Sequence, residues 1–175
     1  MKSQDLATLE KEVSKNSEIY ELFLHELKDI YWAEKRLVEK LPGLSEKATS
    51  EKLKEAIHSH TQETENHVNR LDNIFEILDE KAEGVTCEAM KGLLEESKDV
   101  MKKTDAHYLV RDAGIIITCQ KVEHYEIASY GSLSHLAKIM DLKDSMKILE
   151  ETLEEEKKRT PSCQRLQWKK STLKL

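Results

Sequence analysis

Proline and glycine are scarce in this chain of 175 residues, which contains two prolines and five glycines. Both residue types interrupt helices, so their scarcity beside many Glu, Lys, Leu and Ala residues favours long α-helices. Aromatic residues make up only 5% of the chain, and no strand-like alternation competes with the helical pattern. The composition therefore predicts an all-α protein of one-domain length.

Long apolar runs are absent as well, since no stretch approaches the roughly 18 consecutive apolar residues that a membrane span needs. The first residues, MKSQDLATLEKEVSK, lack the apolar core of a secretion signal. The three cysteines are scattered and form no Cys-x-x-Cys pair, which is typical of a reducing compartment rather than a disulfide framework. We therefore expect a cytoplasmic protein that does not contact a membrane.

Charge is unevenly distributed along the chain, whose formal net charge is −6. Residues 157–175 hold seven basic and no acidic side chains, whereas residues 1–156 hold 21 basic and 34 acidic ones, a net of −13. A basic tail attracts phosphate, but an acidic body repels it. Nucleic-acid binding is therefore a disfavoured alternative that only the tail supports.

Apolar residues recur at intervals of three and four along four long segments, which is the spacing of one helix face. The expected helices, one of them short, span about residues 17–41, 49–80, 87–103, 105–140 and 142–160. The four long helices form two hairpins with short turns, joined by a connection of about 25 residues. This arrangement predicts a ferritin-like antiparallel four-helix bundle with one long crossover that contains the short helix.

Local signals predict where the helices begin and end. Ser17 is suited to cap the first helix, and Pro42 is expected to end it. Gly84 closes the second helix, and Pro161 should end the last one near Thr160 because proline cannot continue the hydrogen-bond ladder. The chain is accordingly divided into a polar N-terminal arm, a bundle and a basic C-terminal tail, at residues 1–16, 17–160 and 161–175.

Acidic side chains lie on or beside the apolar stripe of every long segment. They are, in chain order, Glu34, Glu63, Glu123, Glu126 and Glu156. A buried carboxylate is costly unless it is protonated, paired or bound to a metal, and clustered carboxylates need a cation between them. Two bridged divalent ions would satisfy them together. A solvated acidic face is the alternative for any one of them, and it is the expectation for Glu150, Glu151, Glu154 and Glu155.

Two histidines share the apolar stripe of the second segment. His60 lies one turn before Glu63, and His67 lies further along the same stripe. Either could be a core histidine bonded to a neighbouring Glu or Thr, and His60 is the expected nitrogen ligand. Tyr130, on the third long segment, could donate a hydrogen bond to an interior carboxylate or simply pack in the core.

Three segments around these residues, ELKDIYWAEKRLVEKLP, HSHTQETENHVNRL and QKVEHYEIASYGSL, resemble the YciF-type stress proteins of the ferritin-like superfamily, which are related to rubrerythrins. The resemblance covers about residues 17–158 and implies a di-metal site. The ligands that it implies are Glu34, His60, Glu63, Glu123, Glu126 and Glu156.

The sequence departs from the rubrerythrin pattern, in which helices two and four carry Glu-x-x-His. Asn66 stands three residues after Glu63, and Arg159 stands three residues after Glu156. The guanidinium of Arg159 could pair with Glu156 and replace a metal ion. A site so rich in oxygen ligands favours Fe or Mn.

Two functions remain open. Two Fe or Mn ions per chain could reduce peroxide or oxygen, with Glu126 moving on and off one ion as the rubrerythrin resemblance implies. No rubredoxin-like Cys-x-x-Cys module is present in the sequence, so a separate electron donor would be needed. The alternative is a non-enzymatic structural or partner-binding bundle with a degenerate or empty metal site. For either function we expect a stress-related homodimer.

Overall fold

The computed structural model describes residues 17–104 and 108–167, and within them the chain forms helices and no strand. The helices are α2 (Glu18–Lys47), α3 (Glu51–Leu78), α4 (Glu88–Lys103), α5 (Tyr108–Ile139) and α6 (Lys143–Gln167). The polar arm predicted for residues 1–16 lies outside the described residues, as does the tail beyond residue 167.

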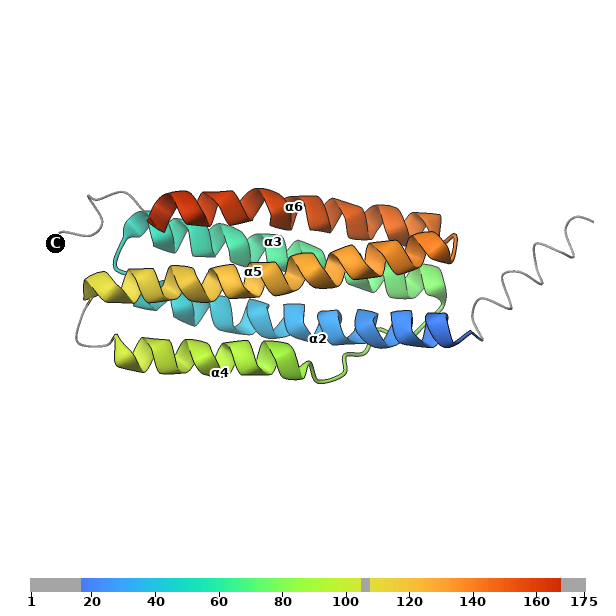
Figure 1. The fold of residues 1–175 in the computed structure, drawn as a ribbon, viewed down its shortest axis with the longest axis horizontal. Coiled ribbons are helices and arrows are strands. Elements are labelled where there is room, and N and C mark those ends of the chain that lie inside the picture. The colour runs from blue at the N-terminus through green and yellow to red at the C-terminus, as the bar shows by residue number, and fades with distance from the viewer. Residues whose placement is uncertain (1–16, 105–107, 168–175) are drawn as a thin grey trace, which may run out of the picture.

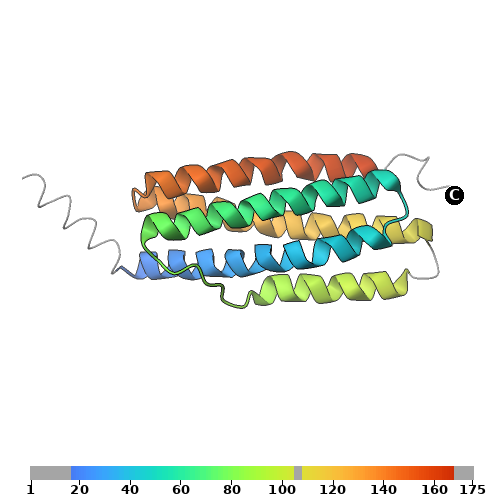
Figure 2. The same cartoon turned by 180° about the vertical axis from the view of Figure 1, so that it is seen from behind.

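Four of the helices, α2, α3, α5 and α6, form a bundle, and α4 lies outside it (Figure 1). The pairs α2–α3 and α5–α6 are hairpins, and they meet through contacts of α2 with α5 and of α3 with α6. Each of these contacting pairs runs antiparallel (Figures 1 and 2). The chain therefore has the predicted ferritin-like bundle, in which the single crossover contains the short helix α4.

The predicted apolar stripes form the core of the bundle. Leu27 of α2, Ile74 of α3 and Leu149 of α6 are each 0% exposed. Burying side chains of this size stabilises the fold by about 1.5–3 kcal/mol each. Because protein interiors are close-packed, polar residues on the same stripes are held firmly as well. In the described part of the chain, no helix is long and apolar enough to cross a membrane.

Side chains cap the starts of α2 and α3. Ser17 caps α2 as predicted, because its hydroxyl accepts a hydrogen bond from the Tyr20 amide at 3.4 Å. The start of α3 is capped from another helix, since Asp112 of α5 accepts hydrogen bonds from the amides of Thr49 and Ser50 at 2.7 and 2.9 Å. A carboxylate is favourable at the positive end of a helix. This contact ties α5 to the turn between α2 and α3.

Two helices run through the prolines that the sequence predicts as stops, so both predicted ends are wrong. α2 continues past Pro42 to Lys47, and α6 continues past Pro161 to Gln167. A proline removes one backbone donor and crowds the preceding turn, but helix can persist on both sides of it. In α2 the added turn packs the half-buried Leu44 against the core, which offsets that loss.

The connection from α3 to α4 crosses α2 (Figure 2). α3 ends at the left-handed Asp79, whose φ is 54°, so the prediction that Gly84 closes the helix is wrong. Gly84 instead lets the backbone of the crossover pass close to α2, because a Cβ at this position would lie 2.8 Å from the Cβ of Trp32. Next to it, the Val85 amide donates a hydrogen bond to the carbonyl of Lys28 at 3.2 Å. The crossover is thus fastened to α2.

Candidate metal centre

Acidic side chains from α2, α5 and α6 and histidines from α3 meet in the bundle interior. They are Glu34, His60, His67, Glu123, Glu126 and Glu156, and none is more than 3% exposed. All of them lie on apolar stripes, so the packing that buries the stripes also buries these polar groups. Four carboxylates in such a place are costly unless they hold protons or share a cation.

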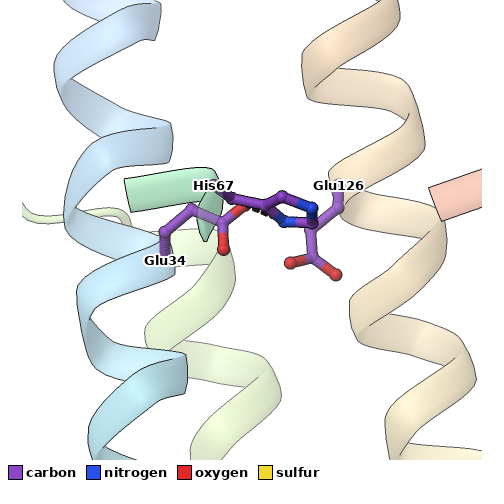
Figure 3. Close-up of side chains that lie close together, drawn as sticks. All are labelled: Glu34, His67 and Glu126. Carbon is purple, nitrogen blue, oxygen red and sulfur yellow. Dashed lines mark ion pairs between the residues drawn. The ribbon is translucent and has the colours of Figure 1, made fainter. Parts of the chain in front are cut away.

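Two groups of three side chains could each hold a metal ion among the described residues. Glu34, His67 and Glu126 form the first group, and His60, Glu126 and Glu156 form the second. Within each group the ligand atoms lie within 4.8 Å of one another. The first group converges from α2, α3 and α5 (Figure 3). Glu126 belongs to both groups, so its carboxylate would be within reach of an ion held by either one.

Glu126 is the carboxylate of the cluster with the fewest polar contacts among the described residues. Its side chain is 0% exposed, and neither carboxylate oxygen has a hydrogen-bond partner among the described residues. Burial raises its pKa well above the usual value, and the charges of Glu156 and Glu34 raise it further. Burial also raises the pKa of Glu156, to about 7. Without a cation these groups hold protons near neutral pH, and a metal ion would displace them.

His67 is oriented as metal-binding histidines usually are. Its Nε2 lies 3.0 Å from Oε2 of Glu155, and its Nδ1 lies 3.6 Å from Oε1 of Glu34 and 3.5 Å from Oε1 of Glu156. Arg70 holds Glu155 in turn, because its two guanidinium nitrogens donate to the two carboxylate oxygens at 2.7 and 2.8 Å. A histidine that donates one N–H to a carboxylate can bind a metal with its other nitrogen.

The protonation of His67 follows from its acidic surroundings. Arg70 lowers the pKa of Glu155 to about 2, so this carboxylate is ionised at neutral pH. Burial alone would lower the pKa of His67, but the nearby carboxylates of Glu34 and Glu156 and the hydrogen bond to Glu155 outweigh burial and raise it. His67 is therefore drawn toward its charged form in the metal-free protein. A metal ion would have to displace that proton.

His60 and Tyr130 complete the surroundings of the cluster. Burial, followed by the charge of Arg159, holds the pKa of His60 well below its usual value. Its imidazole is thus neutral, as a ligand must be, and its Nε2 has no hydrogen-bond partner in the part of the chain that the structure describes. Tyr130 donates a hydrogen bond to Oε1 of Glu34 at 2.6 Å, so of the two roles that the sequence left open for this tyrosine the structure shows the hydrogen bond.

Glu63 lies at the edge of the cluster, although the resemblance implies that it is a ligand. Its side chain is 41% exposed and forms an ion pair with Arg159. The Arg159 guanidinium also lies 3.3 Å from Oε1 of Glu156, so the pairing expected from the sequence is present. Only 10% of the Arg159 side chain is exposed. The guanidinium of Arg159 thus places a positive charge between α3 and α6.

The remaining predicted residues are placed as follows. Glu123 is fully buried one turn before Glu126, but it belongs to neither three-residue group among the described residues. His67, which the sequence suggested only as one of two interior histidines, lies in the first group. The signal for it was available, because a spacing of seven residues puts His60 and His67 on one face of α3.

Glu155 corrects the prediction of a fully solvated acidic face on the last helix. Its side chain is 34% exposed and contacts both His67 and Arg70. No sequence pattern indicates this role, because the arginine that turns the carboxylate inward comes from α3, a separate helix. Only the packing of α3 against α6 brings them together.

Fold and cluster together define the class of protein as a ferritin-like four-helix bundle with carboxylates and histidines in its interior. Residues 18–168 match the family described as Domain of unknown function (DUF892), and the chain belongs to this family. The protein YciF of Escherichia coli K12 is 44% identical over 140 residues, which cover 79% of this chain and 84% of YciF. The predicted membership among YciF-type proteins is therefore confirmed.

Solved structures agree with this assignment. The crystal structure of the E. coli stress protein YciF matches with a TM-score of 0.81 at 42% identity, over 85% of this chain and 94% of YciF. YcfI of Rhodopseudomonas palustris, for which a structural role has been suggested, matches with a TM-score of 0.82 at 37% identity and the same coverage of 85% and 94%. A Xanthomonas campestris protein at 19% identity shares the fold alone, with a TM-score of 0.68 over 86% of this chain and 91% of that one.

Proposed function

We propose that the chain binds two Fe or Mn ions in the buried cluster and reduces peroxide or oxygen there. The observation that carries this proposal is the carboxylate of Glu126, which is fully buried and belongs to two adjacent three-residue groups. Neither of its oxygens has a hydrogen-bond partner among the residues described. Two cations would satisfy this carboxylate together with its neighbours Glu34 and Glu156.

The residues present fit such a pair of ions. Glu34 and His67 would hold one ion, His60 and Glu156 would hold the other, and Glu126 would lie between them. A donor set of carboxylates with two imidazoles suits Fe or Mn. When bound, ions of variable oxidation state would supply the redox chemistry that the polypeptide itself lacks.

The chain's own side chains would hold the ligands in position and keep water out. Tyr130 fixes the orientation of Glu34 by its hydrogen bond, and burial raises the pKa of this tyrosine so that it keeps its proton. Arg70 and Glu155 fix the ring of His67 in the same way. Such supporting contacts set the affinity and selectivity of a metal site.

The biological setting of this proposal comes from the relatives and from the sequence. YciF is described as a stress protein and is 44% identical to this chain, which supports a stress-related role. The reduction would need a separate electron donor. We further propose that the protein is a cytoplasmic homodimer, as the cysteine content and the family resemblance suggest.

A second candidate is a non-enzymatic structural or partner-binding bundle, and Arg159 is the observation that favours it. Its guanidinium contacts Glu63 and Glu156, so it can balance the interior negative charge without a second metal ion. The structural role suggested for YcfI, which is 37% identical, points the same way. Under this alternative the cluster remains protonated or ion-paired and turns over no peroxide.

Elemental analysis distinguishes the two candidates. Protein purified without chelator, or reloaded anaerobically with Fe(II) or Mn(II), should hold about two ions per chain. Glu126→Gln should lose most of this metal with unchanged helicity, and the loaded wild type should consume peroxide when a reductant is added. A wild-type protein that retains no Fe or Mn after reloading would sink the metal proposal and leave the structural one.

A further inference from the structure

Two cavities reach the cluster and share His60 and Cys119 in their walls. The larger has a volume of about 500 Å³ and is bordered by the charged side chains of Glu63 and Arg159. The smaller has a volume of about 330 Å³ and lies between α2, α4 and α5, with His60 of α3 also in its wall. Cavities of this size accommodate small organic molecules.

The smaller cavity, called the apolar cavity below, has aliphatic walls. They are formed by Leu37, Leu41, Leu44, Leu94, Met101 and Val122. Its charged side chains are exposed and therefore belong to its solvent side; they are Glu39, Lys40, Glu46, Lys47 and Lys98, and the hydroxyl residues Ser97 and Thr118 also line the cavity. His60, in contrast, is 3% exposed and has a ring nitrogen without a hydrogen-bond partner among the described residues. The apolar walls thus lead to a residue of the interior cluster, and in the metal-free protein the His60 ring is an available polar group in the buried part of the cavity.

We propose that the apolar cavity binds an organic hydroperoxide, with the apolar group of the molecule in the cavity and its hydroperoxide group toward His60. The inference rests on the proposed function and names its substrate class. Reduction would break the O–O bond, take up two protons and two electrons from a separate one-electron donor protein, and give an alcohol and water. The alcohol keeps the apolar group and therefore binds in the same cavity.

The difference between the two cavities supports an organic substrate. Hydrogen peroxide gains hydrogen bonds from Glu63 and Arg159 in the larger cavity, whereas the leucine, methionine and valine side chains of the apolar cavity offer it none. An alkyl or aryl group gains free energy from the apolar walls in proportion to the area it buries. Leu94, Ser97 and Met101 belong to α4, so the helix outside the bundle supplies one side of this cavity.

Binding of 2-phenyl-2-propanol, the alcohol formed from cumene hydroperoxide, to the metal-free full-length protein tests the site without any reaction. For a ligand of about ten non-hydrogen atoms we expect calorimetry to give a Kd on the order of 0.1–1 mM. Gly43 lines the cavity, and a Cβ added there meets no atom within 4 Å, so Gly43→Trp adds bulk at a position where the backbone leaves room for a side chain to begin. Ser97→Trp adds bulk from α4 on the opposite side.

Gly92→Trp is the matched control, because Gly92 also has open space within 4 Å and is not part of the cavity wall. The Gly43 and Ser97 variants should weaken binding by about tenfold or more, whereas the control should bind like the wild type. The metal-loaded wild type should also consume cumene hydroperoxide faster than hydrogen peroxide, and Gly43→Trp should lose that preference.

The outcomes separate the two proposals. No binding by the metal-free wild type, or equal binding by all variants, overturns the hydroperoxide site even when the loaded protein consumes hydrogen peroxide. A different result overturns the proposed reduction. In it, both cavity variants lose binding of the alcohol, but the metal-loaded protein consumes neither cumene hydroperoxide nor hydrogen peroxide, so the hydroperoxide is not a substrate. Binding lost in both variants, with the preference for cumene hydroperoxide, supports both proposals.

Discussion

The interior cluster has two halves that share Glu126, and they are supported in different ways. The first half contains Glu34 and His67, and the second contains His60 and Glu156. On one side, Tyr130 donates to Glu34, and an acidic residue that is itself held by an arginine orients His67. On the other side, the guanidinium of Arg159 contacts Glu156 directly. The first half resembles a metal site whose ligands are already held by supporting hydrogen bonds. The second half already contains a cation, the guanidinium of Arg159. The two positions should therefore differ in metal affinity, the first binding more tightly.

Glu126 is common to both halves, and its replacement should have the largest effect. Glu126→Gln removes the negative charge that both ions would share, so we expect metal content to fall from about two ions to fewer than about half an ion per chain. Glu150→Gln, at an exposed position of α6, is the control and should bind as the wild type does. Elemental analysis gives both numbers, and a Glu126 variant that keeps both ions would contradict the bridging role.

The same variant should also raise the stability of the metal-free protein. A neutral amide removes a buried ionisable group whose pKa is raised well above the usual value by burial and by neighbouring acids. We expect a higher Tm at pH 7 in the presence of chelator. An unchanged or lower Tm would contradict the destabilising burial of this carboxylate.

Arg159 is the residue that should set the difference between the halves. Arg159→Met removes the competing cation, so affinity for the second ion should rise by about tenfold or more while the first ion is little affected. Titration with Mn(II), followed by electron paramagnetic resonance, separates the two affinities. Arg36→Met is the control, because Arg36 pairs with Glu39 on the exposed surface of α2. A second ion that binds more weakly without Arg159 would show that the guanidinium supports the site.

Tyr130 supports only the first half, so its replacement should weaken that half alone. Tyr130→Phe removes the hydrogen bond to Glu34, and supporting contacts of this kind change metal affinity by about 10-fold to 100-fold. The cost in stability should be about 1 kcal/mol. Tyr31→Phe is the matched control, because it removes the hydrogen bond to Asp72 at 2.7 Å without touching the cluster. Equal metal affinities in the two variants would contradict the supporting role.

The pH dependence of stability should be the smallest effect and should have opposite signs at two acidic residues. Burial raises the pKa of Glu156 to about 7, so this residue stabilises the metal-free fold below pH 4.5 and loses that contribution as the pH rises to about 7. Arg70 lowers the pKa of Glu155 to about 2, so its contribution is present above pH 4.5 and is lost as the pH falls toward 2.

Chemical denaturation of metal-free protein across this pH range checks both slopes. Glu156→Gln should reduce the loss of stability between pH 4.5 and 7 and leave the part that the raised pKa of Glu126 contributes, and Glu155→Gln should reduce the loss at acidic pH. Glu150→Gln again serves as the control. A wild-type curve without a decline toward pH 7 would contradict the raised pKa of Glu156.

Helical periodicity was enough to predict the architecture and most of the interior cluster. Glu34, Glu126 and Glu156 lie on apolar stripes, and burial of a stripe carries every residue on it into the core. Glu63 lies only beside its stripe, and the structure leaves it 41% exposed at the edge. Periodicity therefore predicts burial more accurately for residues at the centre of a helix face than for residues at its margin.

The sequence by itself determined that the chain is all helical. It also determined that three of the four bundle helices turn a carboxylate inward and that the fourth turns its histidines inward. These features depend only on the periodicity of a single helix. Only the tertiary structure decided that Arg70 directs Glu155 toward His67, that Arg159 enters the cluster, and that α4 closes an apolar cavity. Each of these relations joins separate helices, and the rotation of one helix against another is set by core packing, which no single helix encodes.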